Sequence, residues 1–82
     1  MAQKHLQLTI SQVDAPVFDG EVLSVIVPGV AGVMEILANH EALISPLKAG
    51  KIVVKKVDGS REEYDIESGT LEISHNHATI LI

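Results

Sequence analysis

Apolar and polar residues alternate near the start of this chain in the pattern of a half-buried strand. Leu6, Leu8 and Ile10 fall on one side, and the residues between them are polar. A period of two indicates a β-strand with one buried face. The Asp-Ala-Pro sequence at residues 14–16 is expected to end this first strand.

Turn-forming residues divide the rest of the chain into short apolar segments. A second strand is expected over residues 21–27, after an Asp-Gly turn signal at 19–20 and before Pro-Gly at 28–29. It is apolar enough to lie between two layers. Residues 30–40 predict two short strands joined by turns, because Asn39 tolerates a left-handed backbone.

Further short strands are expected at residues 43–47 (closed by Gly50), 52–57, 64–68, 71–74 and 78–82. The Asp-Gly-Ser sequence at 58–60 is a strong hairpin signal, and a turn is expected at residues 75–77. The pattern therefore predicts between eight and about ten short strands and no convincing helix. Turn signals roughly every 8–12 residues favour an all-β fold, a small antiparallel β-sandwich or flattened barrel, with residues 1–82 as one domain.

Composition requires an aliphatic core. The chain has 82 residues, 46% of them hydrophobic, with no cysteine and with Phe18 and Tyr64 as its aromatic side chains. Neither disulfides nor a cysteine-bound metal can supplement the core. The longest apolar run, residues 25–27, is far shorter than the ~20 residues that span a bilayer. The N-terminus lacks the apolar stretch of a signal peptide, so a cytoplasmic location is the default expectation.

The charge balance argues against a nucleic-acid partner. The formal net charge is −5, whereas phosphate binding needs clustered Lys and Arg. The basic residues concentrate at Lys48, Lys51, Lys55 and Lys56. Because they flank a predicted strand, edge protection or solubility is the preferred interpretation over a phosphate-binding track.

Two groups of residues are candidates for metal binding or catalysis. His75 and His77 have the spacing that places two metal ligands on one strand face, and His5 and His40 could join them only through the fold. The preferred interpretation is polar turn residues, and no metal site is expected. The acidic residues between positions 62 and 67 are interpreted as a solvated strand face, since acid–base catalysis needs carboxylates in unlike environments.

Residues 28–34 are unusually rich in small and apolar side chains. Turn-rich segments usually lie on the surface, where exposed Val and Met mark a partner site. Val33 and Met34 could equally belong to a core strand, and both interpretations stay open at this point. Gly29 and Gly32 lack the Lys-Ser/Thr sequence of a P-loop, so they do not indicate a nucleotide site.

An ordered set of residues along nearly the whole chain resembles the N-terminal domain of ATP synthase ε (epsilon) subunits. It comprises Phe18-Asp19-Gly20-Glu21-Val22, Val25-Ile26-Val27-Pro28-Gly29, Gly32, Ile36, His40, Leu43-Ile44, Lys48-Ala49-Gly50 and Ser68-Gly69-Thr70-Leu71-Glu72-Ile73. The resemblance implies a ten-stranded β-sandwich at the foot of the central stalk of a bacterial-type F-type ATP synthase. It would bind the γ (gamma) subunit and the c-ring and couple proton translocation to ATP synthesis. It implies no catalytic residue and no cofactor.

The resemblance also assigns candidate contact residues. The γ-facing positions fall on His40 and Ser45, and the c-ring loop falls on Val30, Ala31, Gly32 and Val33. Relatives usually have Gly-Glu-Leu-Gly where this chain has residues 32–35, so an acid is absent from the loop. Its charge is either shifted to Glu35, or the contact is apolar here. Asn39 stands where relatives have Gly at a turn.

Many relatives carry a two-helix C-terminal domain that inhibits ATP hydrolysis, and the present sequence has no such hairpin. If these residues are the whole gene product, inhibition by that route is not expected. The implied location is peripheral, on the cytoplasmic face of the inner (plasma) membrane. Two alternatives are a free-standing cytosolic β-sandwich that binds a ligand and a small cupin-like metalloenzyme built on the His residues.

Overall fold

Six β-strands form the part of the chain that the computed structural model describes, residues 4–13 and 15–82. They are β1 (Leu6–Gln12), β2 (Ala15–Gly29), β3 (Gly32–Leu37), β4 (Leu43–Lys56), β5 (Arg61–Ser74) and β6 (His77–Leu81). Within these described ranges there is no helix long and apolar enough to cross a membrane.

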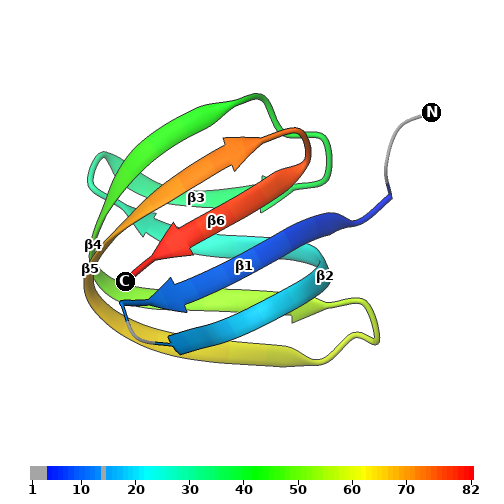
Figure 1. Cartoon of the computed structure of the whole chain (residues 1–82), viewed down its shortest axis with the longest axis horizontal. Coiled ribbons are helices and arrows are strands. Elements are labelled where there is room, and N and C mark those ends of the chain that lie inside the picture. Colours follow the sequence, from blue (N-terminus) through cyan, green and yellow to red (C-terminus); the bar gives the residue numbers. More distant parts are fainter. Residues whose placement is uncertain (1–3, 14) are drawn as a thin grey trace.

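The sheet closes on itself. The strand order is β1-β6-β5-β4-β2-β3, and an additional β1–β2 pairing joins five strands into a ring, with β3 attached outside it (Figure 1). Neighbouring strands are antiparallel except β1 and β6, which run parallel. Closure pairs strand edges that would otherwise be exposed. The all-β, barrel-like sandwich predicted from the sequence is confirmed.

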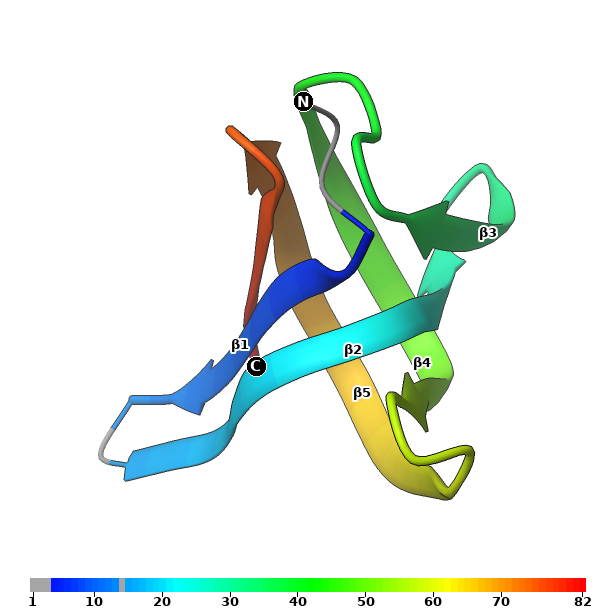
Figure 2. The same ribbon diagram turned by 90° about the vertical axis from the view of Figure 1, so that its right-hand side faces the viewer.

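β1 and β3 follow one another along β2. β1 pairs with Ala15–Val22, and β3 pairs with Ser24–Gly29. Beyond Val22, β2 pairs with β4 as well. The far half of β2 therefore carries β3 away from the ring, as Figure 2 shows from the side.

The predicted count of about ten strands is wrong, because the long strands continue through residues that were interpreted as strand ends. β2 runs through Gly20, β4 through Gly50, and β5 through Gly69. The β4–β5 ladder extends from Leu43 opposite Ile73 to Lys55 opposite Arg61. Residues 30–40 form the single strand β3 instead of two. The glycines allow curvature and close packing inside strands, which a local pattern does not distinguish from a turn.

Several predicted turns are confirmed. Residues 57–60 connect β4 to β5, and the two residues between β5 and β6 are His75 and Asn76. Both have positive φ, 51° and 59°, as a type I′ hairpin turn requires. Asn39 also adopts a left-handed φ of 65°. β1 ends at Gln12 and β2 begins at Ala15, so the predicted break is confirmed, although Asp14 lies outside the described residues.

The core is aliphatic, as composition required. Its buried side chains are Leu6, Leu8, Ile10, Val22, Val25, Val27, Ile36, Leu47, Ile52, Val54, Ile66, Leu71, Ile73, Ala78 and Ile80. The alternation that predicted β1 is confirmed, since its three apolar residues are fully buried. Phe18 and Tyr64 pack against this cluster from the side.

The interpretation of the lysines as edge protection is wrong. The second half of β4 lies between β2 and β5, so its lysines are on an internal strand. Lys51 Nζ lies 3.2 Å from Asp65 and 3.5 Å from Glu63, and Lys56 Nζ lies 2.7 Å from Glu62. Lys51 and Lys56 thus face acidic residues of β5 across the ladder, whereas Lys48 pairs with Ser68 and Lys55 with Arg61.

Candidate functional site

The candidate c-ring loop is the tip of the β2–β3 hairpin. Val30 and Ala31 form its two-residue turn, and Gly29 pairs with Gly32 beneath them. A Cβ on Gly29 would lie 2.6 Å from the carbonyl oxygen of Gly32, so the two backbones pack at a distance that only glycine permits. The Val30 N–H donates to the Pro46 carbonyl at 3.1 Å, which ties the tip to β4.

The tip presents apolar surface to solvent. Val30 is 56% exposed and Val33 is 73% exposed. Met34, in contrast, packs against the core. The core interpretation is therefore correct for Met34 and wrong for Val33, because neighbouring residues of a strand face opposite sides. Glu35 is exposed on the same side of β3 as Val33.

The candidate γ-facing residues lie apart: His40 follows the far end of β3, and Ser45 lies on β4 next to Pro46, which is bonded to the tip. His40 is exposed in the loop of residues 38–42, and its Nδ1 lies 2.8 Å from the Glu41 carbonyl oxygen. A carbonyl only accepts, so Nδ1 donates, and Nε2 of the neutral ring is an acceptor. Ser45 lies on β4, half-buried, with its hydroxyl 3.2 Å from the Pro46 carbonyl oxygen.

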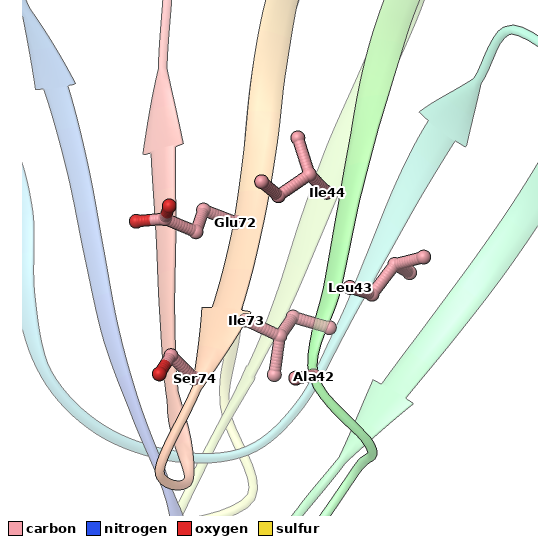
Figure 3. A pocket seen from close by; sticks show the side chains of 6 residues that line it. All are labelled: Ala42, Leu43, Ile44, Glu72, Ile73 and Ser74. Atoms are coloured by element: carbon pink, nitrogen blue, oxygen red, sulfur yellow. The ribbon is translucent and has the colours of Figure 1, made fainter.

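A shallow hollow opens beside this loop at the end of the β4–β5 ladder (Figure 3). Its volume is about 450 Å³, and its lining comprises Ala42, Leu43, Ile44, Glu72, Ile73 and Ser74. Ile44 is 69% exposed and pairs with Glu72 across the ladder. The sequence analysis did not predict that Ile44 and Glu72 lie together on the surface. The adjacent apolar residues Leu43 and Ile44 could have indicated it, because neighbouring residues of a strand face opposite sides and only Leu43 packs against the core.

A second hollow, of about 200 Å³, lies where the last residues of the chain meet β5. It is lined by Gln12, Asp65, Ile66, Glu67, Ser68 and Ile82. Both hollows are largely open to solvent. Neither is the deep apolar cavity that a small-ligand binding module would use.

The histidines considered as metal ligands occupy separate positions. His75 is in the β5–β6 turn, while His77 begins β6 with its Nε2 2.9 Å from Thr9 Oγ1. His5 Nδ1 lies 3.6 Å from Glu21. Among residues 4–13 and 15–82, no three His, Asp or Glu side chains are grouped so that they could hold a metal ion.

The acidic side chains of β5 pair with lysine and tyrosine. The Tyr64 hydroxyl donates to Glu62 at 2.6 Å, and Lys56 binds the other oxygen of the same carboxylate. The hydrogen bond from Lys56, followed by that from Tyr64, holds the pKa of Glu62 below its usual value. Burial, with a smaller contribution from Glu62, raises the pKa of Tyr64 to about 12. Glu62 is thus a paired carboxylate on a strand face, held in its ionised form, and not one half of an acid and base in unlike environments.

The chain is similar to known proteins over nearly its whole length. The family model described as ATP synthase, Delta/Epsilon chain, beta-sandwich domain matches residues 5–82. The ATP synthase epsilon chain of Chlorobium limicola is 38% identical over 80 residues, covering 98% of this chain and 91% of that protein. The epsilon chain of Latilactobacillus sakei is 41% identical over 81 residues, and the match covers 96% of this chain but 56% of the relative.

Solved structures show the same fold. A chain of the Euglena gracilis mitochondrial ATP synthase, solved with OSCP, F1 and c-ring, superimposes with a TM-score of 0.93 at 22% identity, covering 99% of this chain and 52% of that one. A chain of the Tetrahymena thermophila mitochondrial ATP synthase central stalk and c-ring gives 0.76 at 16% identity, with coverages of 98% and 63%. By its sequence match over residues 5–82, this chain belongs to the ATP synthase delta/epsilon chain family, of which it carries the β-sandwich domain.

Proposed function

We propose that residues 1–82 form a single ε-type domain that acts as a non-catalytic central-stalk subunit of a bacterial-type F-type ATP synthase. It couples proton translocation through the c-ring to ATP synthesis by binding the γ subunit. The observation that carries this proposal is the family match over residues 5–82, together with a relative named epsilon chain of which this chain covers 91%.

The fold suits a part that transmits torque. Five strands close into a ring, and the enclosed aliphatic side chains are almost inaccessible to solvent. Interiors packed in this way have low compressibility and transmit strain. The catalytic work belongs to other subunits, and the domain needs no cofactor for this role.

The proposed c-ring contact and His40 lie at opposite ends of β3. The c-ring contact is assigned to Val30, Ala31, Gly32 and Val33, and the γ contact to His40 and Ser45. β3 has six residues, so it separates His40 from the tip by about 20 Å at ~3.3 Å per residue. Ser45 lies closer to the tip, because its neighbour Pro46 accepts the Val30 N–H. The separation of His40 from the tip lets the domain contact two partners at different places.

The c-ring contact is proposed to be mainly apolar, with an acid beside it. Val33 and Glu35 are both exposed on one face of β3, and Val30 is exposed at the tip. By the family resemblance the acid of relatives falls at the position of Val33, and Glu35 offers a charge of that sign two residues along the same face of β3. The domain is placed on the cytoplasmic face of the inner (plasma) membrane, peripherally and through the complex.

Co-expression with the cognate γ subunit tests the proposal. The two proteins are expected to co-elute as a stable complex in size-exclusion chromatography. His40→Ala should weaken that complex, whereas Glu67→Ala, at an exposed position on β5, should not. Failure of the wild-type chain to co-elute with γ would reject the assignment, and an unchanged His40→Ala complex would reject His40 alone.

A further inference from the structure

The side chain of Asn76 joins three segments that are far apart in sequence. Its Nδ2 donates to the carbonyl oxygen of His5 at 2.8 Å, and its Oδ1 accepts from the backbone N–H of Asn39 at 2.7 Å. Its own carbonyl accepts from the Gln7 N–H at 3.2 Å. One residue of the β5–β6 turn thus binds both the start of β1 and the loop between β3 and β4.

Asparagine is the one residue type that meets every demand of this position. Asn76 is the second central residue of a type I′ turn, with φ of 59°, which favours Gly, Asn or Asp. Its side chain must also donate to a carbonyl and accept from an N–H, and both partners are backbone groups of fixed polarity. Glycine can do neither, and an ionised aspartate can only accept.

The segment that Asn76 holds is the one that carries His40. Asn39 immediately precedes His40 and is itself left-handed, and residues 39–42 are exposed. In Figure 2 this loop and the β5–β6 turn both lie at the top of the molecule. The bond to Asn39 therefore fixes the backbone next to an exposed histidine.

We propose that Asn76 is a positioning residue for the γ-binding loop: it holds Asn39, and through it His40, in the conformation that binds γ. This inference rests on the proposed function. A loop ordered before binding loses less conformational entropy when the complex forms, so a preorganised loop binds more tightly. Asn76 itself need not contact γ.

Two substitutions separate the two bonds of the amide. Asn76→Asp keeps the left-handed turn and the acceptor for Asn39, but loses the donor to His5. Asn76→Gly keeps the turn and loses both bonds. His75→Gly, at the neighbouring left-handed position, is the matched control, because the His75 side chain hydrogen-bonds to the adjacent Ser74 at 2.9 Å.

The first measurement is amide hydrogen exchange at Asn39 in the isolated domain, read by NMR alongside thermal unfolding. Asn76→Gly should lower the protection of the Asn39 N–H about tenfold, the cost of one lost hydrogen bond. Asn76→Asp and His75→Gly should stay within about threefold of wild type. Equal protection in Asn76→Gly and wild type, with both folded, would overturn the inference.

The second measurement is affinity for purified cognate γ subunit. Asn76→Gly should bind about tenfold more weakly, while Asn76→Asp should restore binding to within about threefold of wild type. The effect should vanish in a His40→Ala background, since Asn76 acts through that loop. If Asn76→Gly binds γ as tightly as wild type, or Asn76→Asp as weakly as Asn76→Gly, the positioning role is wrong. If wild type itself does not bind γ, the proposed function fails instead, and hydrogen exchange still decides whether Asn76 holds the loop.

Discussion

Gly50 of β4 packs directly against the ring of Pro28 at the end of β2. A Cβ built on Gly50 would lie 2.9 Å from Pro28 Cβ and 3.2 Å from its Cγ, and the φ of Gly50 is +158°. Both the space and the backbone conformation therefore exclude a side chain. This contact lies at the irregularity of the β2–β4 ladder, between the pairs Gly29–Leu47 and Ile26–Val53.

Gly50→Ala should destabilise the domain by about 1–3 kcal/mol, because the added methyl group must displace a buried proline ring. The matched control is Gly20→Ala, where the new Cβ would make only ordinary contacts, 3.8 Å from the Phe18 ring. That variant should differ from wild type by less than about 0.5 kcal/mol. Urea unfolding followed by circular dichroism measures both, and equal stabilities of the two variants would contradict the packing account.

The opposite orientations of Val33 and Met34 give a second prediction. Val33→Ser should change the free energy of unfolding by no more than about 0.5 kcal/mol, because Val33 is mostly exposed. Met34→Ser should cost about 1–3 kcal/mol, because Met34 packs against the core and a hydroxyl would be left there. Under the proposed function, Val33→Ser should still lower binding to c-ring vesicles. A Val33→Ser variant as unstable as Met34→Ser would contradict the assigned orientation of β3.

Tyr64 predicts how stability depends on alkaline pH. Its pKa is raised from 10.0 to about 12 in the folded chain, first by burial and then by the hydrogen bond to Glu62. A raised pKa favours the protonated form in the folded state, so this stabilisation is complete below pH 10 and is lost as pH rises from 10 through 12. Tyr64→Phe should make stability depend less steeply on pH in that window.

Part of the alkaline dependence should remain in Tyr64→Phe, because the pKa of Lys56 is also raised, chiefly by its hydrogen bond to Glu62. Tyr64 is the single tyrosine of the chain, so the ultraviolet absorbance of tyrosinate reports its titration directly. A midpoint near 10.0 in the folded protein would show that the phenol is not held by Glu62 as described.

The fold class was predictable from the sequence because it depends on local signals. The alternation of apolar and polar residues predicted β1. The Asp-Gly pair at 58–59 and the His-Asn pair at 75–76 predicted two hairpin turns. The number of strands was not predictable, because Gly50 and Gly69 read locally as strand ends. Their reasons are non-local: Gly50 meets Pro28, and a Cβ on Gly69 would lie 2.7 Å from the Leu81 carbonyl oxygen.

The candidate site likewise combines features that local sequence predicts with features that depend on distant contacts. The exposed tip at Val30 and the left-handed turn at Asn39 were expected from residue type. The link from Asn76 to Asn39 spans 37 positions in the chain, and no spacing rule predicts it. The outward Ile44 beside Glu72 likewise depends on which face of β4 the core occupies.

Coupling itself is the most direct test of the proposed function. Membrane vesicles carrying the cognate ATP synthase stripped of its ε subunit should hydrolyse ATP with little proton pumping. Adding this chain should restore ATP-driven proton pumping, measured by quenching of a pH-sensitive dye, while the chain alone hydrolyses no ATP. If pumping per ATP hydrolysed does not rise although the chain is bound to γ, the coupling role is wrong.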